Sequence, residues 1–347
     1  MVRLPLHPAY FATLVLLGCS HPAVKAGPSH TADTADTSDT ADTADTADTA
    51  DTARFYHYVA SEIALPTTPD EAAAAAFDLD ADGRADNALG GLLAALADPT
   101  NGGIDVAGAT AGAVASGGLV YLLSLGTVSV ADDPAATWQT YVGSETESAP
   151  AFDGTDAFSV DATGPTDAVI PASITAGRVS AGPGNIFLPM VLSAGRSAIR
   201  LPLAGAFVEA DVDDDGCRSG RVGGGVSKPA IDSILVPELA ASFDAIVEAA
   251  GDACRSGARK GDYSACDNAA KTVLMLFDNS PQDGAITTDE LARNKSIQTI
   301  LVPDVDLIDD TERYNPTQPT DATFDPESLS FAAAFSCRKA SFDAPGE

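Results

Sequence analysis

Short apolar segments separated by Gly, Pro and Asp fill the middle of the chain, from residue 118 to residue 225. Many of these segments are rich in β-branched residues, and their length and spacing are typical of strands. The predicted strands are residues 119–125, 127–130, 138–142, 157–160, 168–179, 186–192 and 198–210. Strands joined by such short turns predict an antiparallel sheet or a sandwich.

Helical patterns lie on both sides of this region. They cover residues 70–76, 87–97, 229–250, 264–277 and 288–301. The uncharged residues 106–131 are rich in Gly and Ala, which favours a buried helix followed by strands over a membrane span. At the C-terminus, alternate residues form one apolar strand face that returns to the core, namely Leu329, Phe331, Ala333, Phe335 and Cys337. We therefore expect an α+β fold, with a central antiparallel sheet or sandwich and helices at both sequence ends.

The first eighteen residues have the pattern of an export signal. Arg3 precedes an apolar run over residues 11–17, and the segment ends in Leu16-Leu17-Gly18-Cys19. This pattern resembles the lipobox of bacterial lipoproteins, in which the cysteine is lipidated after the preceding residues are removed. The resemblance implies lipidation at Cys19, and Ser20 fits transfer to an outer membrane. Ordinary secretory cleavage is the alternative.

A three-residue repeat follows the signal. Residues 31–52 repeat Thr-Ala-Asp, with one Thr-Ser-Asp, and carry seven aspartates. This period matches neither a helix face nor a strand face, and the like charges repel one another. We therefore predict a disordered, low-complexity tether over residues 19–54, and one folded domain over residues 55–347. A subdivision into residues 55–225 and 226–347 is possible.

The chain is strongly acidic. It has 50 Asp and Glu against 19 Lys and Arg, for a net charge of −31. Nucleic acid is therefore a poor partner, whereas cations and basic partners are favoured. A plain solvated surface explains much of such charge, but some aspartates recur at the spacing of metal ligands.

Four cysteines remain after Cys19. In an exported chain an even number of cysteines predicts disulfides. We expect Cys254 to pair with Cys266, because the residues between them form a short loop, and Cys217 to pair with Cys337. A zinc site is the alternative, but the spacings are not those of zinc ligand pairs.

Histidine is absent from the whole chain after His57. Without it, Ser-His-Asp and Cys-His catalysis and histidine-bound catalytic metals are excluded from residues 58–347. Carboxylate-only hydrolysis survives as an alternative, although Glu and aromatic residues are scarce. We therefore predict that the protein is not an enzyme.

The clearest metal motif lies in residues 77–87, here called the Asp78 loop. Its carboxylates fall at positions 1, 3, 5 and 9 of a calcium loop, with glycine at position 6. The predicted metal residues are Asp78, Asp80, Asp82, Arg84 and Asp86. Position 12, normally a bidentate Glu, is Leu89, so the site is either weaker or completed by an oxygen from elsewhere. An aspartate-rich turn without an ion is the alternative.

A second candidate, the Asp278 loop, covers residues 278–290. Asp283, Gly284 and Glu290 match the EF-hand pattern, but the first ligand sits one residue too early. The predicted metal residues are Asp278, Ser280, Asp283 and Glu290. A helix-loop-helix that keeps its shape without an ion is the alternative.

The third candidate, the Asp211 loop, covers residues 211–216. Asp211, Asp213 and Asp215 alternate before Gly216. This pattern fits either a metal site or a turn held by the neighbouring Cys217.

The order of lipobox, acidic tether, calcium loop, β region and EF-hand-like segment resembles a group of uncharacterised bacterial lipoproteins with calcium loops. The resemblance implies a lipid-anchored, Ca²⁺-binding protein of the outer membrane or cell surface, with a structural or adhesive role and a membrane partner through its anchor. An extracellular ligand-binding module is the alternative.

Overall fold

The computed structural model describes residues 53–97, 104–279, 281–307, 314 and 326–345. The chain divides into two units, Met1–Asp48 and Thr49–Glu347, and the described residues all belong to the second. The signal, Cys19 and residues 19–52 of the predicted tether lie outside the described residues.

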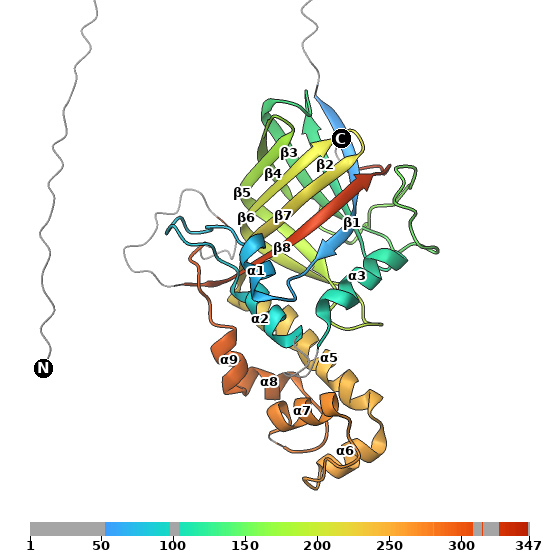
Figure 1. Ribbon diagram of the computed structural model, residues 1–347, viewed down its shortest axis with the longest axis vertical. Coiled ribbons are helices and arrows are strands. Elements are labelled where there is room, and N and C mark those ends of the chain that lie inside the picture. The colour runs from blue at the N-terminus through green and yellow to red at the C-terminus, as the bar shows by residue number, and fades with distance from the viewer. Residues whose placement is uncertain (1–52, 98–103, 280, 308–313, 315–325, 346–347) are drawn as a thin grey trace, which may run out of the picture. The chain divides into compact units, whose positions relative to one another are not determined.

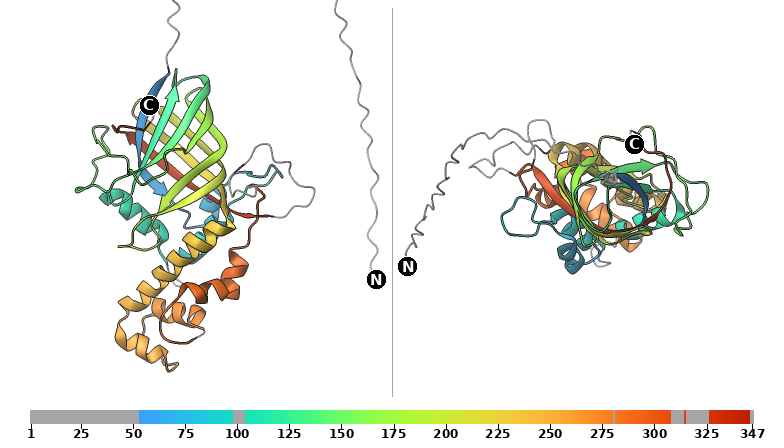
Figure 2. Two further views of the ribbon diagram at one scale, coloured as in Figure 1. Left: turned by 180° about the vertical axis from the view of Figure 1, so that it is seen from behind. Right: turned by 90° about the horizontal axis from the view of Figure 1, so that it is seen from above.

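The described strands form a closed antiparallel barrel (Figure 1). Each strand pairs with its neighbours in sequence, and the last strand pairs with the first. Seen end-on, the strands enclose a ring (Figure 2). The strands are β1 (Arg54–Ala64), β2 (Val120–Thr127), β3 (Asp133–Gly143), β4 (Val169–Thr175), β5 (Arg178–Met190), β6 (Ile199–Asp213), β7 (Gly216–Ser227) and β8 (Ser328–Lys339).

The helices lie within connections of the barrel. The β1–β2 connection carries α1 (Pro69–Ala75), α2 (Ala88–Ala97) and α3 (Val106–Ser116). The β7–β8 connection carries α4 (Lys228–Ala230), η2 (Ile231–Leu235), α5 (Val236–Ala249), α6 (Asp252–Ala258), α7 (Asn268–Phe277), α8 (Thr288–Arg293) and α9 (Lys295–Ile300). None of the helices in the described segments is both long enough and apolar enough to cross a membrane.

The antiparallel order fixes which end of the barrel each connection occupies. The β1–β2 and β7–β8 connections lie at the same end, and both groups of helices gather there (Figure 1). The short β2–β3, β4–β5 and β6–β7 turns lie at the opposite end. We call these the helical end and the hairpin end.

The predicted α+β fold with an open sheet or sandwich is wrong. Most of the predicted central strands correspond to strands, but residues 157–160 form only isolated bridges, residues 128–130 belong to a turn, and residues 168–179 cover β4 and the start of β5. The sheet closes through pairing between β1 and β8. These strands are too far apart in sequence for a local pattern to reveal their contact. The helices are also not at the sequence ends, because β1 precedes α1 and β8 follows α9.

Side chains fill the barrel interior. Alternate residues of each strand face inward, as the two-residue period of a strand requires, and small barrels are filled in this way. Tyr58, Leu125, Trp138 and Ile170 are at most 1% exposed. The predicted inward face of β8 is confirmed, since Leu329, Phe331, Ala333, Phe335 and Cys337 are all buried in the main core.

Two smaller apolar clusters lie on the outer surface of the wall. One joins Val120 and Leu122 of β2 to Phe342, beyond the end of β8. The other joins Phe77 and Leu79 to Val305 and Ala332. The second cluster attaches the Asp78 loop to the barrel.

Both predicted disulfides are confirmed. Cys217 and Cys337 face each other on β7 and β8 and are bonded. Cys254 on α6 is bonded to Cys266, just before α7. Two disulfides are compatible with an exported protein, because such bonds persist in oxidising compartments.

Candidate metal centre

The Asp78 loop brings three of its carboxylates together. Oxygens of Asp78, Asp80 and Asp86 all lie within 4.8 Å of one another. Calcium binds oxygen at about 2.3–2.6 Å, so two ligands on opposite sides of one ion are about 5 Å apart. The three side chains therefore fit around a single ion. In the described part of the chain, no other three acidic, histidine or cysteine residues bring their ligand atoms this close.

The backbone of the loop curls around these carboxylates. The Gly83 N–H donates to Asp78 Oδ2 at 3.1 Å, and the Leu79 N–H donates to Asp86 Oδ2 at 2.9 Å. Ala81 has a φ of 61° and Gly83 a φ of 87°. Such left-handed angles let the chain reverse direction, and glycine adopts them without strain. The glycine of the motif is therefore required by the turn.

Two of the predicted metal residues lie outside the group of three. Asp82 accepts a hydrogen bond from the Arg84 N–H at 2.8 Å, and its other oxygen lies 4.0 Å from Arg84 Nη1. The Arg84 side chain is 85% exposed. Asp82 and Arg84 thus pair with each other at the tip of the loop.

The start of the loop is packed on the outer wall of the barrel. The Phe77 ring stacks on Phe207 of β6, with ring centroids 6.0 Å apart. The Arg221 guanidinium of β7 lies 4.2 Å from the Phe77 centroid and also donates to Ala76 O at 2.7 Å. Leu79 is 6% exposed. Burial of these side chains fixes the loop to β6 and β7.

Negative charge accumulates at the buried side of the loop. The pKa of the Asp86 carboxyl is raised to about 6, chiefly by burial and also by the charges of Asp80, Asp304 and Asp82, against the hydrogen bond from Leu79, which lowers it. Both burial and like charges disfavour an ionised carboxylate. A cation at this position would relieve both effects.

Sequence reasoning missed Asp304 as a neighbour of this centre. Asp304 Oδ1 accepts from Ser330 N at 2.7 Å and Asp304 Oδ2 from Ser330 Oγ at 2.6 Å. These bonds hold Asp304 against β8, and the next residue, Val305, packs with Ala332 and Leu79. Its segment lacks a glycine, and no local signal indicates that it meets residues more than two hundred positions earlier.

The Asp278 loop lies between α7 and α8, as predicted, but it is closed by its own hydrogen bonds. Asp278 is 2% exposed and accepts from Asp283 N and Gly284 N, both at 2.9 Å. Burial raises the pKa of Asp278, with added repulsion from Glu290 and Asp283. Ser280 lies outside the described residues.

Glu290 has a structural task in this loop. Its Oε2 accepts from Thr287 N at 2.9 Å and Thr287 Oγ1 at 2.8 Å, and Glu290 N donates to Thr287 Oγ1. This reciprocal arrangement is a capping box at the start of α8. The Glu290 carboxylate, which the EF-hand pattern predicts as a bidentate calcium ligand, therefore already accepts hydrogen bonds from Thr287.

The Asp211 loop is the hairpin between β6 and β7. Asp211 pairs with Arg178 at 2.9 Å, and Asp213 pairs with Arg218 at 2.7 Å. Asp215 N donates to Asp213 Oδ1 at 3.0 Å, as in an Asx turn. The structure does not gather Asp211, Asp213 and Asp215 around one point.

The Asp78 centre has the chemistry of a hard-cation site. It brings together the carboxylate oxygens of three aspartates, of which Asp78 is exposed and Asp80 and Asp86 are half-buried, and calcium prefers oxygen ligands of this kind. Three carboxylates give a charge that a divalent ion partly neutralises. We found no protein-family model, no curated protein and no solved structure that matches this chain, so the expected membership of a lipoprotein group stays a prediction.

Proposed function

We propose that this chain is a calcium-binding structural protein, held outside the cell membrane by a lipid on Cys19. The convergence of Asp78, Asp80 and Asp86 within 4.8 Å carries the proposal of the metal site. The lipobox residues and the acidic repeat carry the proposal of the anchor and tether, and the disulfides are compatible with export. The outer membrane or cell surface is the proposed location.

The ion in this proposal acts as a clamp between chain segments. The Asp78 loop belongs to the β1–β2 connection, and Asp304 belongs to the β7–β8 connection. Burial is the main cause of the raised pKa of Asp86, and the charge of Asp304 adds to it, so carboxylates of the two connections repel one another. A calcium ion among them replaces repulsion by attraction and holds both connections on the outer wall of β6, β7 and β8.

The site is suited to calcium at extracellular concentrations. It lacks the bidentate Glu of tight EF-hand loops, and exposed sites in extracellular modules have dissociation constants of about 10⁻⁴–10⁻³ M. An ion that binds only the folded state at a hundredfold excess over its dissociation constant adds about 2.7 kcal/mol to the free energy of unfolding. Calcium would therefore rigidify the protein only where calcium is abundant.

Calorimetric titration of the protein with calcium tests the proposal. We expect one saturable site, which is lost in the variant Asp78→Asn, Asp80→Asn. The matched control is Asp232→Asn, Asp289→Asn, which removes two exposed charges that each form a surface pair with a neighbouring helix residue. The tether aspartates are the same in all three proteins, so their weak binding cancels. Equal calcium binding by the parent and the loop variant would refute the proposed site at Asp78 and Asp80.

Heat unfolding with and without chelator provides an independent measurement. Calcium is expected to raise the midpoint of the parent and the control variant by several degrees, because about 2–3 kcal/mol of binding free energy is added to the folded state. The loop variant is expected to show no rise. A midpoint that chelator leaves unchanged in all three proteins would refute the clamp.

A further inference from the structure

One strand edge in the barrel wall is unpaired at the hairpin end. β8 ends at Lys339, opposite Tyr58 of β1. The last bond between these segments runs from Ala340 N to His57 O at 3.0 Å, and the chain then turns away, because Ser341 N donates to Asp156 O. Residues 54–56 of β1 continue beyond this point and pair with β2. Within the described chain, no strand pairs with their other side.

The backbone of Phe55 faces this unpaired edge. In an antiparallel strand, the N–H and C=O of each residue point to one side, and the side alternates along the strand. The His57 carbonyl points toward β8, since it accepts from Ala340. Phe55 is two residues away, so its N–H and C=O point the same way. An unpaired edge of this kind is a template for another strand.

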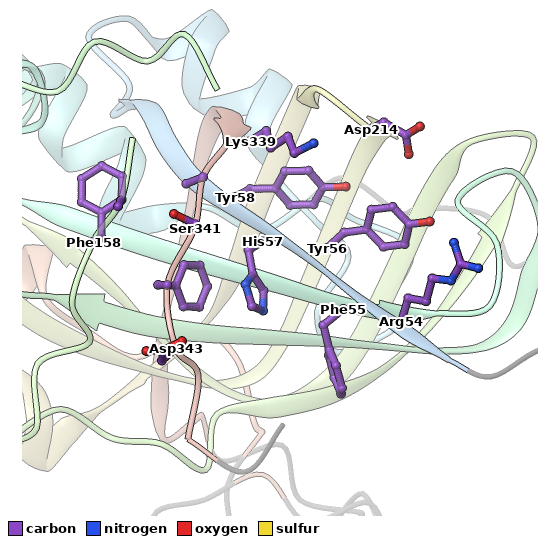
Figure 3. Close-up of a pocket in the computed structure, with 13 residues that line it drawn as sticks. Arg54, Phe55, Tyr56, His57, Tyr58, Phe158, Asp214, Lys339, Ser341 and Asp343 are labelled. Carbon is purple, nitrogen blue, oxygen red and sulfur yellow. The ribbon is translucent and has the colours of Figure 1, made fainter. Parts of the chain in front are cut away.

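A cavity of about 640 Å³ runs along this edge (Figure 3). Five consecutive residues of β1, Arg54 to Tyr58, line it. Consecutive strand residues point to opposite faces, so the cavity spans both faces of the sheet. The backbone of an added strand would occupy such a space. We call it the edge slot.

The edge slot has a defined inner boundary and a far wall. The Tyr58 hydroxyl donates to Asp213 O at 3.0 Å and so links β1 to the β6–β7 hairpin. Asp214, at the tip of that hairpin, lines the far side of the cavity. The edge slot therefore lies beside β1 beyond the end of β8, with the tip of the β6–β7 hairpin on its far side.

Charge distinguishes the two faces of the edge slot. Arg54 and Lys339 line it, and no carboxylate among the described residues pairs with either. On the opposite face, Phe55 is 47% exposed. Continuing the β8 register places the next residue of an incoming strand opposite Tyr56, between Lys339 and Arg54. The residue after it lies opposite Phe55.

We propose that the edge slot binds an extended segment of another protein, which adds to β1 as an antiparallel strand. The recognised pattern is an acidic residue opposite Tyr56 followed by an apolar residue opposite Phe55. Beside Tyr56, the cations Arg54 and Lys339 outnumber Asp214 and favour the acidic side chain. Asp343, the other carboxylate that lines the slot, lies on the side of His57 (Figure 3). The Phe55 ring favours the apolar side chain. Two main-chain hydrogen bonds with Phe55 supply sequence-independent affinity, as in other strand-addition complexes.

This site is separate from the calcium centre. The edge slot lies at the hairpin end and the Asp78 loop follows the far end of β1, at the helical end. Peptide binding is therefore expected to persist in chelator. A failure of calcium binding would leave peptide binding intact, and the reverse also holds.

The test uses the full chain and a fluorescent tetrapeptide with blocked ends, Asp-Phe-Val-Thr, which begins opposite Tyr56 because Ala340 already occupies the place opposite His57. Saturable binding is expected in fluorescence anisotropy. Replacing the peptide Asp by Lys should weaken binding about fivefold to tenfold, since a partly exposed charge pair contributes about 1 kcal/mol. Methylating the amide nitrogen of the peptide Phe should weaken it about tenfold, because one of the hydrogen bonds to Phe55 is lost.

Protein variants locate the binding. Arg54→Glu should weaken the Asp peptide and strengthen the Lys peptide, whereas the matched control Lys260→Glu, outside the edge slot, should change neither. Phe55→Pro removes the edge donor in a position that tolerates proline. It should abolish binding while the heat-unfolding midpoint stays near that of the parent.

Two results would overturn the proposal. One is a failure of the expected binding pattern: either no saturable binding is seen, or the Asp, Lys and N-methylated peptides bind equally. Equal binding would indicate an unspecific apolar patch. The other is concentration-dependent self-association of the chain that Arg54→Glu abolishes and the peptide inhibits. In that case the occupant is a second copy of this chain and not another protein.

Discussion

The side-chain amide of Asn87 pairs with the backbone of Ala332. Asn87 Nδ2 donates to Ala332 O at 3.1 Å, and Ala332 N donates to Asn87 Oδ1 at 2.8 Å. β1 stops pairing with β8 at Ala64, opposite Ala334. In this register Ala332 would lie opposite residue 66, two residues beyond Ala64. The Asn87 amide therefore takes the place that this residue would occupy if β1 continued, and the end of the Asp78 loop becomes part of the barrel wall.

The same side chain also fixes both neighbouring helices. Nδ2 donates to Ala72 O in α1 at 2.9 Å, and Oδ1 accepts from Gly90 N in α2 at 3.0 Å. A Cβ on Gly90 would lie 2.3 Å from Asn87 Oδ1. A side chain at this position would therefore displace the Asn87 amide from these hydrogen bonds.

Asn87→Ala is expected to lower the free energy of unfolding by about 2–4 kcal/mol, because four hydrogen bonds are lost and partly buried groups of Ala332 stay unpaired. Urea unfolding measures this change. Asn279→Ala is the matched control, since Asn279 is exposed and its side-chain amide donates to the carbonyl of Leu276, within the same turn. Its expected cost is below about 1 kcal/mol. Equal losses in the two variants would contradict the role of Asn87.

Local signals in the sequence predict several elements well. The helices on either side of the Asp78 loop, the glycine turn at Gly83 and the inward face of β8 depend on neighbouring residues alone. The pairing of Cys254 with Cys266 depends on a short loop. In each case the determining interactions lie within about twenty positions, where residue patterns are informative.

Barrel closure and the neighbours of the metal centre could not be predicted in the same way. Closure depends on pairing between β1 and β8, and no strand was predicted over the residues of β1. Asp304 meets Asp86 only because β8 carries Ser330 into place. The edge slot exists because β8 is shorter than β1 at the hairpin end. Such features depend on relative strand length and register, which no local pattern encodes.

The two disulfides are expected to differ in their contribution to stability. Cys217 and Cys337 are 120 residues apart, whereas Cys254 and Cys266 are 12 apart. A crosslink over a longer loop removes more entropy from the unfolded chain, by about 2 kcal/mol for this difference in length. The Cys217→Ser, Cys337→Ser variant should therefore unfold at lower urea than the Cys254→Ser, Cys266→Ser variant. The opposite order would show that loop entropy does not decide the relative stability of the two variants.

The stability that Asp86 contributes to the metal-free protein should fall as pH rises from about 4 to above 6. The Asp86 pKa is about 6 in the folded state and about 3.9 in an unfolded chain. Between these values the folded state binds more protons, so the free energy of unfolding falls with pH. The contribution is fully present below about pH 4 and is lost above about pH 6. Buried Asp278 contributes with the same sign.

Urea unfolding in chelator at several pH values measures this dependence. Asp86→Asn should flatten the slope between pH 4 and 6, while Asp232→Asn, at an exposed position, should not. Saturating calcium should oppose the slope in the parent, because binding requires ionised carboxylates. An Asp86→Asn variant with the slope of the parent would show that this carboxyl titrates normally.

Glu290 offers a test of whether the Asp278 loop binds calcium. In the structure its Oε2 accepts two hydrogen bonds from Thr287, and a glutamine oxygen can accept the same two. Glu290→Gln is therefore expected to keep both the stability and the calcium stoichiometry of the parent. Glu290→Ala should lower the free energy of unfolding by about 1 kcal/mol, since the capping box is lost, and should also leave calcium binding unchanged. If the carboxylate instead held an ion in two-oxygen fashion, Glu290→Gln alone would remove one calcium from the calorimetric stoichiometry. That loss would show that the Asp278 loop is a second calcium site, in addition to the Asp78 loop.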